Sequence, residues 1–126
     1  MNTTDKLTKD DFELGLKQFT GTQQYWFHDV PGACRLRLTD GCNFIREEAN
    51  ARWLFDLMAH LQWDKRIGSN FSQHWTLKKE DPNWVLECRN AQGELITARK
   101  IDSTDFPLEQ IDIWLYGGVC LLPSEY

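Results

Sequence analysis

The second half of the chain alternates apolar and polar side chains, and this pattern constrains the fold more than any other feature of the sequence. Because successive side chains of a strand point to opposite faces, a period of two predicts a strand with one buried and one solvent-exposed face. The pattern is clearest over residues 71–78, where Phe71, Gln73, Trp75 and Leu77 alternate with Ser72, His74, Thr76 and Lys78. We therefore expect an antiparallel sheet in this half of the chain.

A turn at residues 90–93 predicts a hairpin between residues 84–89 and 94–101. Gly93 can adopt the left-handed conformation that follows a type I hairpin turn. Pairing Asn90 with Glu94 sets the register and assigns the side chains to the two faces of the sheet. The predicted apolar face carries Leu86, Cys88, Ile96 and Ala98, and the predicted polar face carries Glu87, Arg89, Thr97 and Arg99.

A second hairpin is predicted where Gly117–Gly118 separates residues 111–116 from residues 119–122. Its two predicted faces are both apolar: Ile113, Leu115, Cys120 and Leu122 on one, and Trp114, Tyr116, Val119 and Leu121 on the other. Two interpretations stay open. Either the hairpin is held between the helices and another structural layer, or it exposes an aromatic surface that meets a partner or a second copy of the chain.

The first half of the chain carries the signals of helices. Thr8 and Asp11 resemble a capping box ahead of a short helix over residues 9–18. From residue 42 to residue 63, apolar side chains recur every fourth position. This spacing predicts a helical segment that faces the core, with Asn50 as the candidate point of a break.

These patterns together predict one α+β domain over residues 1–126. Residues 24–28 are predicted to be extended, and residues 34–38 alternate well enough for a short strand. We expect N-terminal helices packed on one face of a four- to five-stranded antiparallel sheet. At 126 residues and 14.8 kDa, the chain is long enough to bury a single core without a metal or disulfide.

The charge and hydropathy of the chain narrow its partners. Lys and Arg together number 14 against 19 Asp and Glu, for a net charge of −5, which makes nucleic-acid binding unlikely. The first residues show no apolar stretch and no cleavage pattern, and no apolar run approaches the roughly 18 residues that a membrane span requires. We expect a cytoplasmic protein that does not enter the membrane.

The cysteines give no sign of a metal or redox site. Cys34, Cys42, Cys88 and Cys120 lie far apart, and no CxxC pair is present. Cys88 and Cys120 fall on strand faces that otherwise carry aliphatic residues, so we expect them to be buried thiols. No cofactor and no metal are expected.

Four side chains at helical spacing are the most suggestive set for chemistry: Glu48, Arg52, Asp56 and His60. On one helix each could reach the next, and Asp56 would orient His60 as a base. The same spacing is typical of a surface ladder of ion pairs, which needs no function beyond solubility. His28 lies among aromatic residues, where a histidine is more often a hydrogen-bonded edge residue than a ligand.

Four segments carry a resemblance to a known family: FTGTQQYWFH (19–28), TDGCNFIREEANARWLFDLMAHLQ (39–62), STDFPLEQIDIWL (103–115) and LLPSEY (121–126). They resemble a family of small bacterial, phage and plasmid proteins that carries a domain-of-unknown-function label. The resemblance implies no known activity. Similar sequences usually have Gly at the position of Asn50, which supports a helix break there. The motif positions that match family members are His28, Asp40, Trp53, Asp56 and Ser124.

We expect a non-enzymatic binding protein that acts through protein contacts, as an accessory or anti-defence inhibitor of a mobile element. The alternative is a small hydrolase or ligand-binding enzyme that uses His28, Asp56 and His60. A third hypothesis is a homodimer whose terminal hairpins meet. The candidate binding residues are accordingly Trp114 and Tyr116, together with those three, and no residue is assigned as catalytic.

Overall fold

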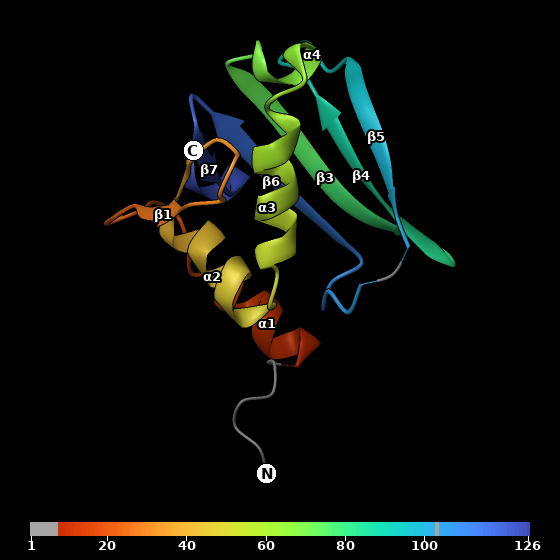
Figure 1. Cartoon of the computed structure of the whole chain (residues 1–126). Coiled ribbons are helices and arrows are strands. Elements are labelled where there is room, and N and C mark those ends of the chain that lie inside the picture. Colours follow the sequence, from red (N-terminus) through yellow and green to blue (C-terminus); the bar gives the residue numbers. More distant parts are fainter. Residues whose placement is uncertain (1–7, 103) are drawn as a thin grey trace.

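The chain folds as an α+β protein whose helices pack on one face of a seven-stranded sheet (Figure 1). The computed structural model describes residues 8–102 and 104–126. The elements are α1 (Lys9–Leu16), β1 (Trp26–His28), β2 (Leu36–Leu38), α2 (Asp40–Glu48), α3 (Arg52–Leu61), α4 (Lys65–Gly68), β3 (Ser72–Glu80), β4 (Asn83–Arg89), β5 (Leu95–Ile101), β6 (Gln110–Tyr116), β7 (Val119–Leu121) and the short 3-10 helix η1 (Pro123–Glu125). None of the described helices combines the length and apolar character needed to cross a bilayer.

The sheet is larger than expected and is not purely antiparallel. Its strand order is β1-β2-β7-β6-β3-β4-β5, and β2 pairs with β7 in parallel through Arg37–Val119 and Leu38–Cys120. The prediction of four to five antiparallel strands was therefore wrong in number and in direction. The expected α+β class is confirmed. The difference arises because the short N-terminal strands join the sheet by pairing with the last strand, and such long-range pairing leaves no mark in a local pattern.

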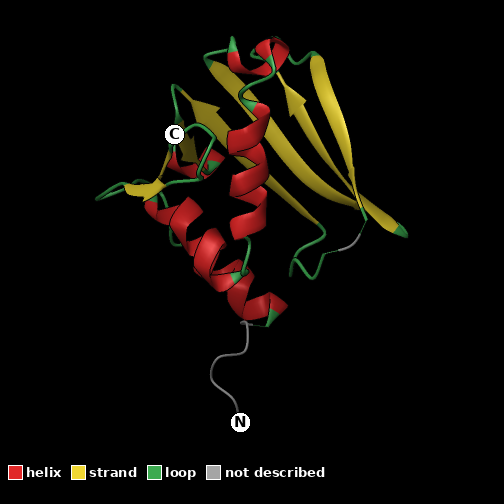
Figure 2. Cartoon of the chain, viewed as in Figure 1, coloured by secondary structure: helices red, strands yellow, loops and turns green. Residues whose placement is uncertain are grey.

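The predicted interruption of the helical segment is confirmed. Asn50 lies between α2 and α3 with φ of 52°, a left-handed conformation that asparagine tolerates better than most residues. Beyond the break, Leu54, Phe55 and Met58 of α3 are fully buried in the cluster that includes Trp75 of β3. Figure 2 shows the helices gathered on one side of the sheet. The opposite side of the sheet, which we call the open face, therefore has no helical layer from residues 8–102 or 104–126.

The two predicted hairpins differ in outcome. The terminal one has the predicted register, with Tyr116 opposite Val119, and positive φ values at Gly117 and Gly118. In the other, the register shifts between Cys88 and Arg89. Beyond this β-bulge, Thr97 pairs with Cys88 and so shares its face, which contradicts the predicted assignment of faces. Arg99 and Ala98 are exchanged in the same way, because they pair with Leu86 and Glu87 respectively.

Candidate functional site

His28 and Asp56 form a close contact between β1 and α3. The His28 Nε2 atom lies 2.6 Å from Asp56 Oδ1, and His28 is almost fully buried whereas the Asp56 side chain is about half exposed. On the other side of the ring, Nδ1 lies 3.1 Å from an Arg46 Nη1 group. Because a guanidinium can only donate, Nδ1 must accept this bond. The ring is therefore neutral, with its proton on Nε2 donated to Asp56.

The surroundings favour this neutral ring. Burial lowers the pKa of His28 below its ordinary value of 6.5, because removal from water penalises the charged form, and the Asp56 carboxylate opposes this shift. The positive charge of Arg46 also lowers the pKa. Both nitrogens of the ring are already engaged within the fold. These contacts therefore hold β1 against α2 and α3.

Arg46 completes this network, although its role was not predicted from the sequence. Its side chain is 8% exposed and donates to the Phe27 carbonyl at 3.2 Å, to Asn43 Oδ1 at 2.7 Å and to Glu47 Oε2 at 3.0 Å. A signal was present, because Arg46 lies four residues after Cys42 on the apolar stripe of the helix. A charged residue on a stripe that faces the core indicates a buried, hydrogen-bonded guanidinium.

The predicted series of contacts along one helix does not form. Arg52 pairs with Glu47 at 3.4 Å, because the break after α2 removes Glu48 from a continuous helix with Arg52. Asp56 contacts His28, and within the described part of the chain no hydrogen bond or ion pair joins it to His60. His60 is exposed on α3. The structure therefore brings His28 and Asp56 together but leaves His60 outside their contact.

A pair of variants separates structure from chemistry at this contact. Asp56→Ala leaves the buried His28 Nε2 proton without its acceptor, and we expect it to lower the free energy of unfolding by about 1–3 kcal/mol. His60→Ala removes an exposed side chain and should change stability by less than about 0.5 kcal/mol. Urea unfolding of both variants measures the difference. Equal stability of the two variants would contradict the structural role of Asp56.

The lowered pKa of His28 also predicts a dependence of stability on pH. As pH falls below about 6.5, this histidine takes up a proton in the unfolded chain before it does so in the folded protein. The free energy of unfolding should therefore decrease as pH falls from about 7 to about 5. His28→Gln cannot titrate, so its unfolding curves should show a smaller change over that window. Parallel pH profiles for the two proteins would contradict the prediction.

A second polar network joins three of the segments that carry the family resemblance. The Glu125 carboxylate accepts from Thr39 Oγ1 at 2.6 Å, from the Gly41 amide at 3.0 Å and from the Leu122 amide at 2.9 Å. Ser124 Oγ donates to the Phe19 carbonyl at 2.8 Å. The carboxylate thus lies at the N-terminal end of α2, where free amides and the helix dipole favour negative charge.

Asp40 fixes the loop that precedes β1. Its carboxylate accepts from the Gln23 amide at 2.9 Å and from Trp26 Nε1 at 3.1 Å, and its own amide donates to Thr22 Oγ1. These hydrogen bonds, led by that from Gln23, lower the pKa of Asp40 below its ordinary value. Asp40 and Ser124, both marked by the resemblance, therefore have structural roles that account for their positions.

Gly41 and Glu125 should be energetically coupled. A Cβ added at Gly41 would lie 2.7 Å from Glu125 Oε1 and 2.6 Å from Leu122 Cδ1, so Gly41→Ala must displace the carboxylate from its donors. We expect Gly41→Ala and Glu125→Ala each to destabilise the fold by about 1–3 kcal/mol. In the double variant the costs should fall short of additivity by more than about 0.5 kcal/mol. Thermal unfolding of the four proteins measures this coupling, and strict additivity would contradict it.

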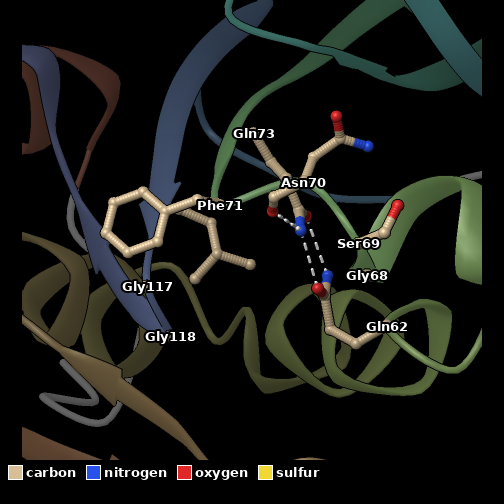
Figure 3. A pocket seen from close by; sticks show the side chains of 9 residues that line it. Gln62, Gly68, Ser69, Asn70, Phe71, Gln73, Gly117 and Gly118 are labelled. Atoms are coloured by element: carbon tan, nitrogen blue, oxygen red, sulfur yellow. Dashed lines mark hydrogen bonds between the residues drawn. The ribbon is translucent and has the colours of Figure 1, made fainter.

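A cavity of about 370 Å³ lies between the end of α3, the loop before β3 and the β6–β7 turn (Figure 3). Its buried polar group is Gln73, whose amide exchanges hydrogen bonds of 2.9 and 2.8 Å with the Gln62 amide. Gln73 also donates to the Ile67 and Asn70 carbonyls and accepts from Trp75 Nε1. Because these partners use the amide fully, the cavity offers a ligand no free buried group from Gln73.

Three of the four thiols are unsuited to nucleophilic chemistry. Cys42, Cys88 and Cys120 are fully buried, which confirms the prediction for the last two. Burial raises the pKa of Cys88 to about 12 and raises those of Cys42 and Cys120 well above the ordinary value. Searched over the described residues, His, Cys, Asp and Glu side chains form no group of three placed to hold a metal ion.

An aromatic patch occupies the open face, and it contains both aromatic residues expected from the terminal hairpin. We define it as His74, Trp114, Tyr116 and Tyr126. The His74 ring stacks on Trp114 with centroids 4.8 Å apart, and His74 Nε2 lies 2.9 Å from the Tyr116 hydroxyl. Tyr126 meets Trp114 and Tyr116 edge-on at 5.6 and 5.4 Å. Burial against these rings raises the pKa of Tyr116.

The patch is accessible. Tyr126 is 81% exposed, and Trp114 and Tyr116 are partly exposed because no helix covers their face of the sheet. His74 lies on this open face, whereas His28 is buried on the helical side, so the two histidines do not share a cleft. The two interpretations of the terminal hairpin differ in whether another structural layer covers its aromatic face. The described residues contain no layer over that face beyond Tyr126, which fits the interpretation of an exposed aromatic surface.

Two cross-strand rows carry the patch across the sheet, and we call them the patch rows. The first contains Phe27, Arg37, Val119, Tyr116 and Ser72 on five neighbouring strands. The second contains Leu121, Trp114, His74 and Arg89. Phe27 is 59% exposed, and the Arg35 guanidinium lies 4.7 Å from its ring centre. Arginine and aromatic side chains are the residues that dominate the energy of protein interfaces.

The fold and this face define a small α+β protein with an aromatic surface on an uncovered sheet. The chain belongs to a family of unknown function, DUF6876, whose pattern matches residues 10–126. No curated protein and no solved structure shows significant similarity to the chain.

Proposed function

We propose that the protein is a non-enzymatic binding protein that contacts another protein through the open face of its sheet. The observation that carries this proposal is the aromatic patch: four rings in mutual contact on a face that the described helices do not cover. Partly exposed Trp and Tyr side chains supply large contact areas at a low cost in conformational entropy. Such a cluster is typical of the centre of a protein interface.

The polar groups of the helical side support binding over catalysis. A small hydrolase or ligand-binding enzyme using His28, Asp56 and His60 is the alternative. It has less support because both ring nitrogens of His28 are engaged and, among the described residues, no hydrogen bond or ion pair joins His60 to Asp56. The setting implied by the family resemblance extends the proposal to an accessory or anti-defence inhibitor of a mobile element, whose target is a host protein.

Variant-dependent capture tests the proposal. Tagged protein is incubated with host lysate, and bound proteins are identified by mass spectrometry. Trp114→Ala and Tyr126→Ala should each weaken capture of the same partner by about 2 kcal/mol or more, which is roughly 30-fold. Leu14→Ala is the matched control, because Leu14 is an exposed apolar residue of α1, 61% exposed. Circular dichroism establishes that every variant is folded.

Two outcomes would overturn this function. The first is a set of captured proteins that does not change between the patch variants and the Leu14→Ala control. The second is a homodimer in sedimentation that Trp114→Glu converts to a monomer, since the patch would then serve self-association instead of a separate partner.

A further inference from the structure

The patch rows differ in charge from the chain as a whole. The chain carries a net charge of −5, yet the two rows contain two arginines, Arg37 and Arg89, and no carboxylate. A third arginine, Arg35, covers the ring of Phe27 at one end. The carboxylates of the open face lie in the neighbouring rows, where Asp112 accepts from Thr76 and Glu87 pairs with Lys78. Because Arg35 and Arg89 have carboxylate partners, the positive charge that the aromatic part of the face leaves unpaired among the described residues is that of Arg37.

Arg37 is the arginine of the patch rows that has no ionic partner among the described residues. Its side chain is exposed at the centre of β2, between Phe27 and Val119 in the first patch row. Among the described residues, no carboxylate oxygen lies within 4.0 Å of its guanidinium. Arg35 pairs with Asp29, and Arg89 pairs with Glu87 at 3.6 Å. A guanidinium presents a planar fork of donors that matches a carboxylate, and the exposed Arg37 pairs across the strands with the aromatic residue Phe27.

We infer that the open face binds an acidic protein surface, in which a carboxylate meets Arg37 and apolar side chains meet the aromatic patch. This inference rests on the proposed function and names the chemistry of its partner. The ion pair at Arg37 would fix the register of the two surfaces, while the rings supply most of the affinity.

Charge also favours an acidic protein surface over two other occupants of the open face, a second copy of the chain and a single-stranded nucleic acid. A second copy would place Arg37 of one chain against the patch of the other, and the patch rows contain no carboxylate that could pair with it. A single-stranded nucleic acid would meet the same arginine. It would also meet the field of a chain with five more negative than positive charges, which opposes a long polyanion.

The test uses two synthetic peptides that differ only in charge. One alternates Glu with Phe and Leu, and the other has Lys at every Glu position. Each is titrated into isotope-labelled full-length protein, and the shifts of the Trp114 indole and of the β6 and β7 amides are followed by NMR. A single-stranded oligo-dT is titrated in the same way. We expect saturable shifts with the Glu peptide that are at least tenfold weaker in Arg37→Gln.

Arg52→Gln is the matched control, because Arg52 is an exposed arginine on α3, in the helical layer. It should bind the Glu peptide as the unaltered protein does. Equal binding of the Lys peptide would overturn the inference, as would tighter binding of oligo-dT or the absence of shifts in the patch. If capture of a partner depends on Trp114 but not on Arg37, the proposed function stands and this inference fails.

Discussion

The parallel pairing of β2 with β7 is the interaction on which the rest of the structure depends. It is short, comprising the Arg37–Val119 and Leu38–Cys120 pairs, with backbone bonds from Arg37 to the Gly118 carbonyl and from Thr39 to the Cys120 carbonyl. Because β2 runs directly into α2, this pairing places the N-terminal end of the helix beside η1, where Glu125 accepts from it. The same pairing sets Phe27 and Arg37 in one row with Tyr116. The hydrogen bonds of Glu125 and the first patch row of the open face therefore both depend on the pairing of β2 with β7.

How much of this arrangement could be predicted depends on the range of the interactions involved. The register of the terminal hairpin was predicted correctly because two adjacent glycines, which have positive φ, set it locally. The break at Asn50 was also a local property of the chain. The bulge near Cys88 was missed because one extra residue exchanges the faces of a strand without changing its composition. The parallel pair was missed because its two strands come from opposite ends of the sequence.

The candidate site residues also divide by range: those marked by a local pattern were predicted, and contacts between distant segments were not. Trp114 and Tyr116 were proposed as binding residues because a hairpin with two apolar faces indicates a surface that needs cover. The partnership of His28 with Asp56 was missed, although both residues were singled out, because it crosses from β1 to α3. His74 was assigned correctly to the exposed side of its strand. Its place in the patch depends on β3 pairing with β6, which the alternation of either strand alone does not specify.

The hydrogen bonding of the buried polar groups supports the proposal that this protein acts through a surface and not through a cleft. His28, Arg46, Gln73 and Glu125 each have hydrogen-bond partners supplied by the fold, and no buried side-chain nitrogen or oxygen of the described residues lacks one. A group with such partners would have to break its hydrogen bonds to contact a substrate, and this would lower the free energy of unfolding. Arg37 and the aromatic rings are in the opposite condition, because the fold leaves them exposed and Arg37 without an ionic partner among the described residues. Binding at the open face can therefore use them without disturbing the helical side.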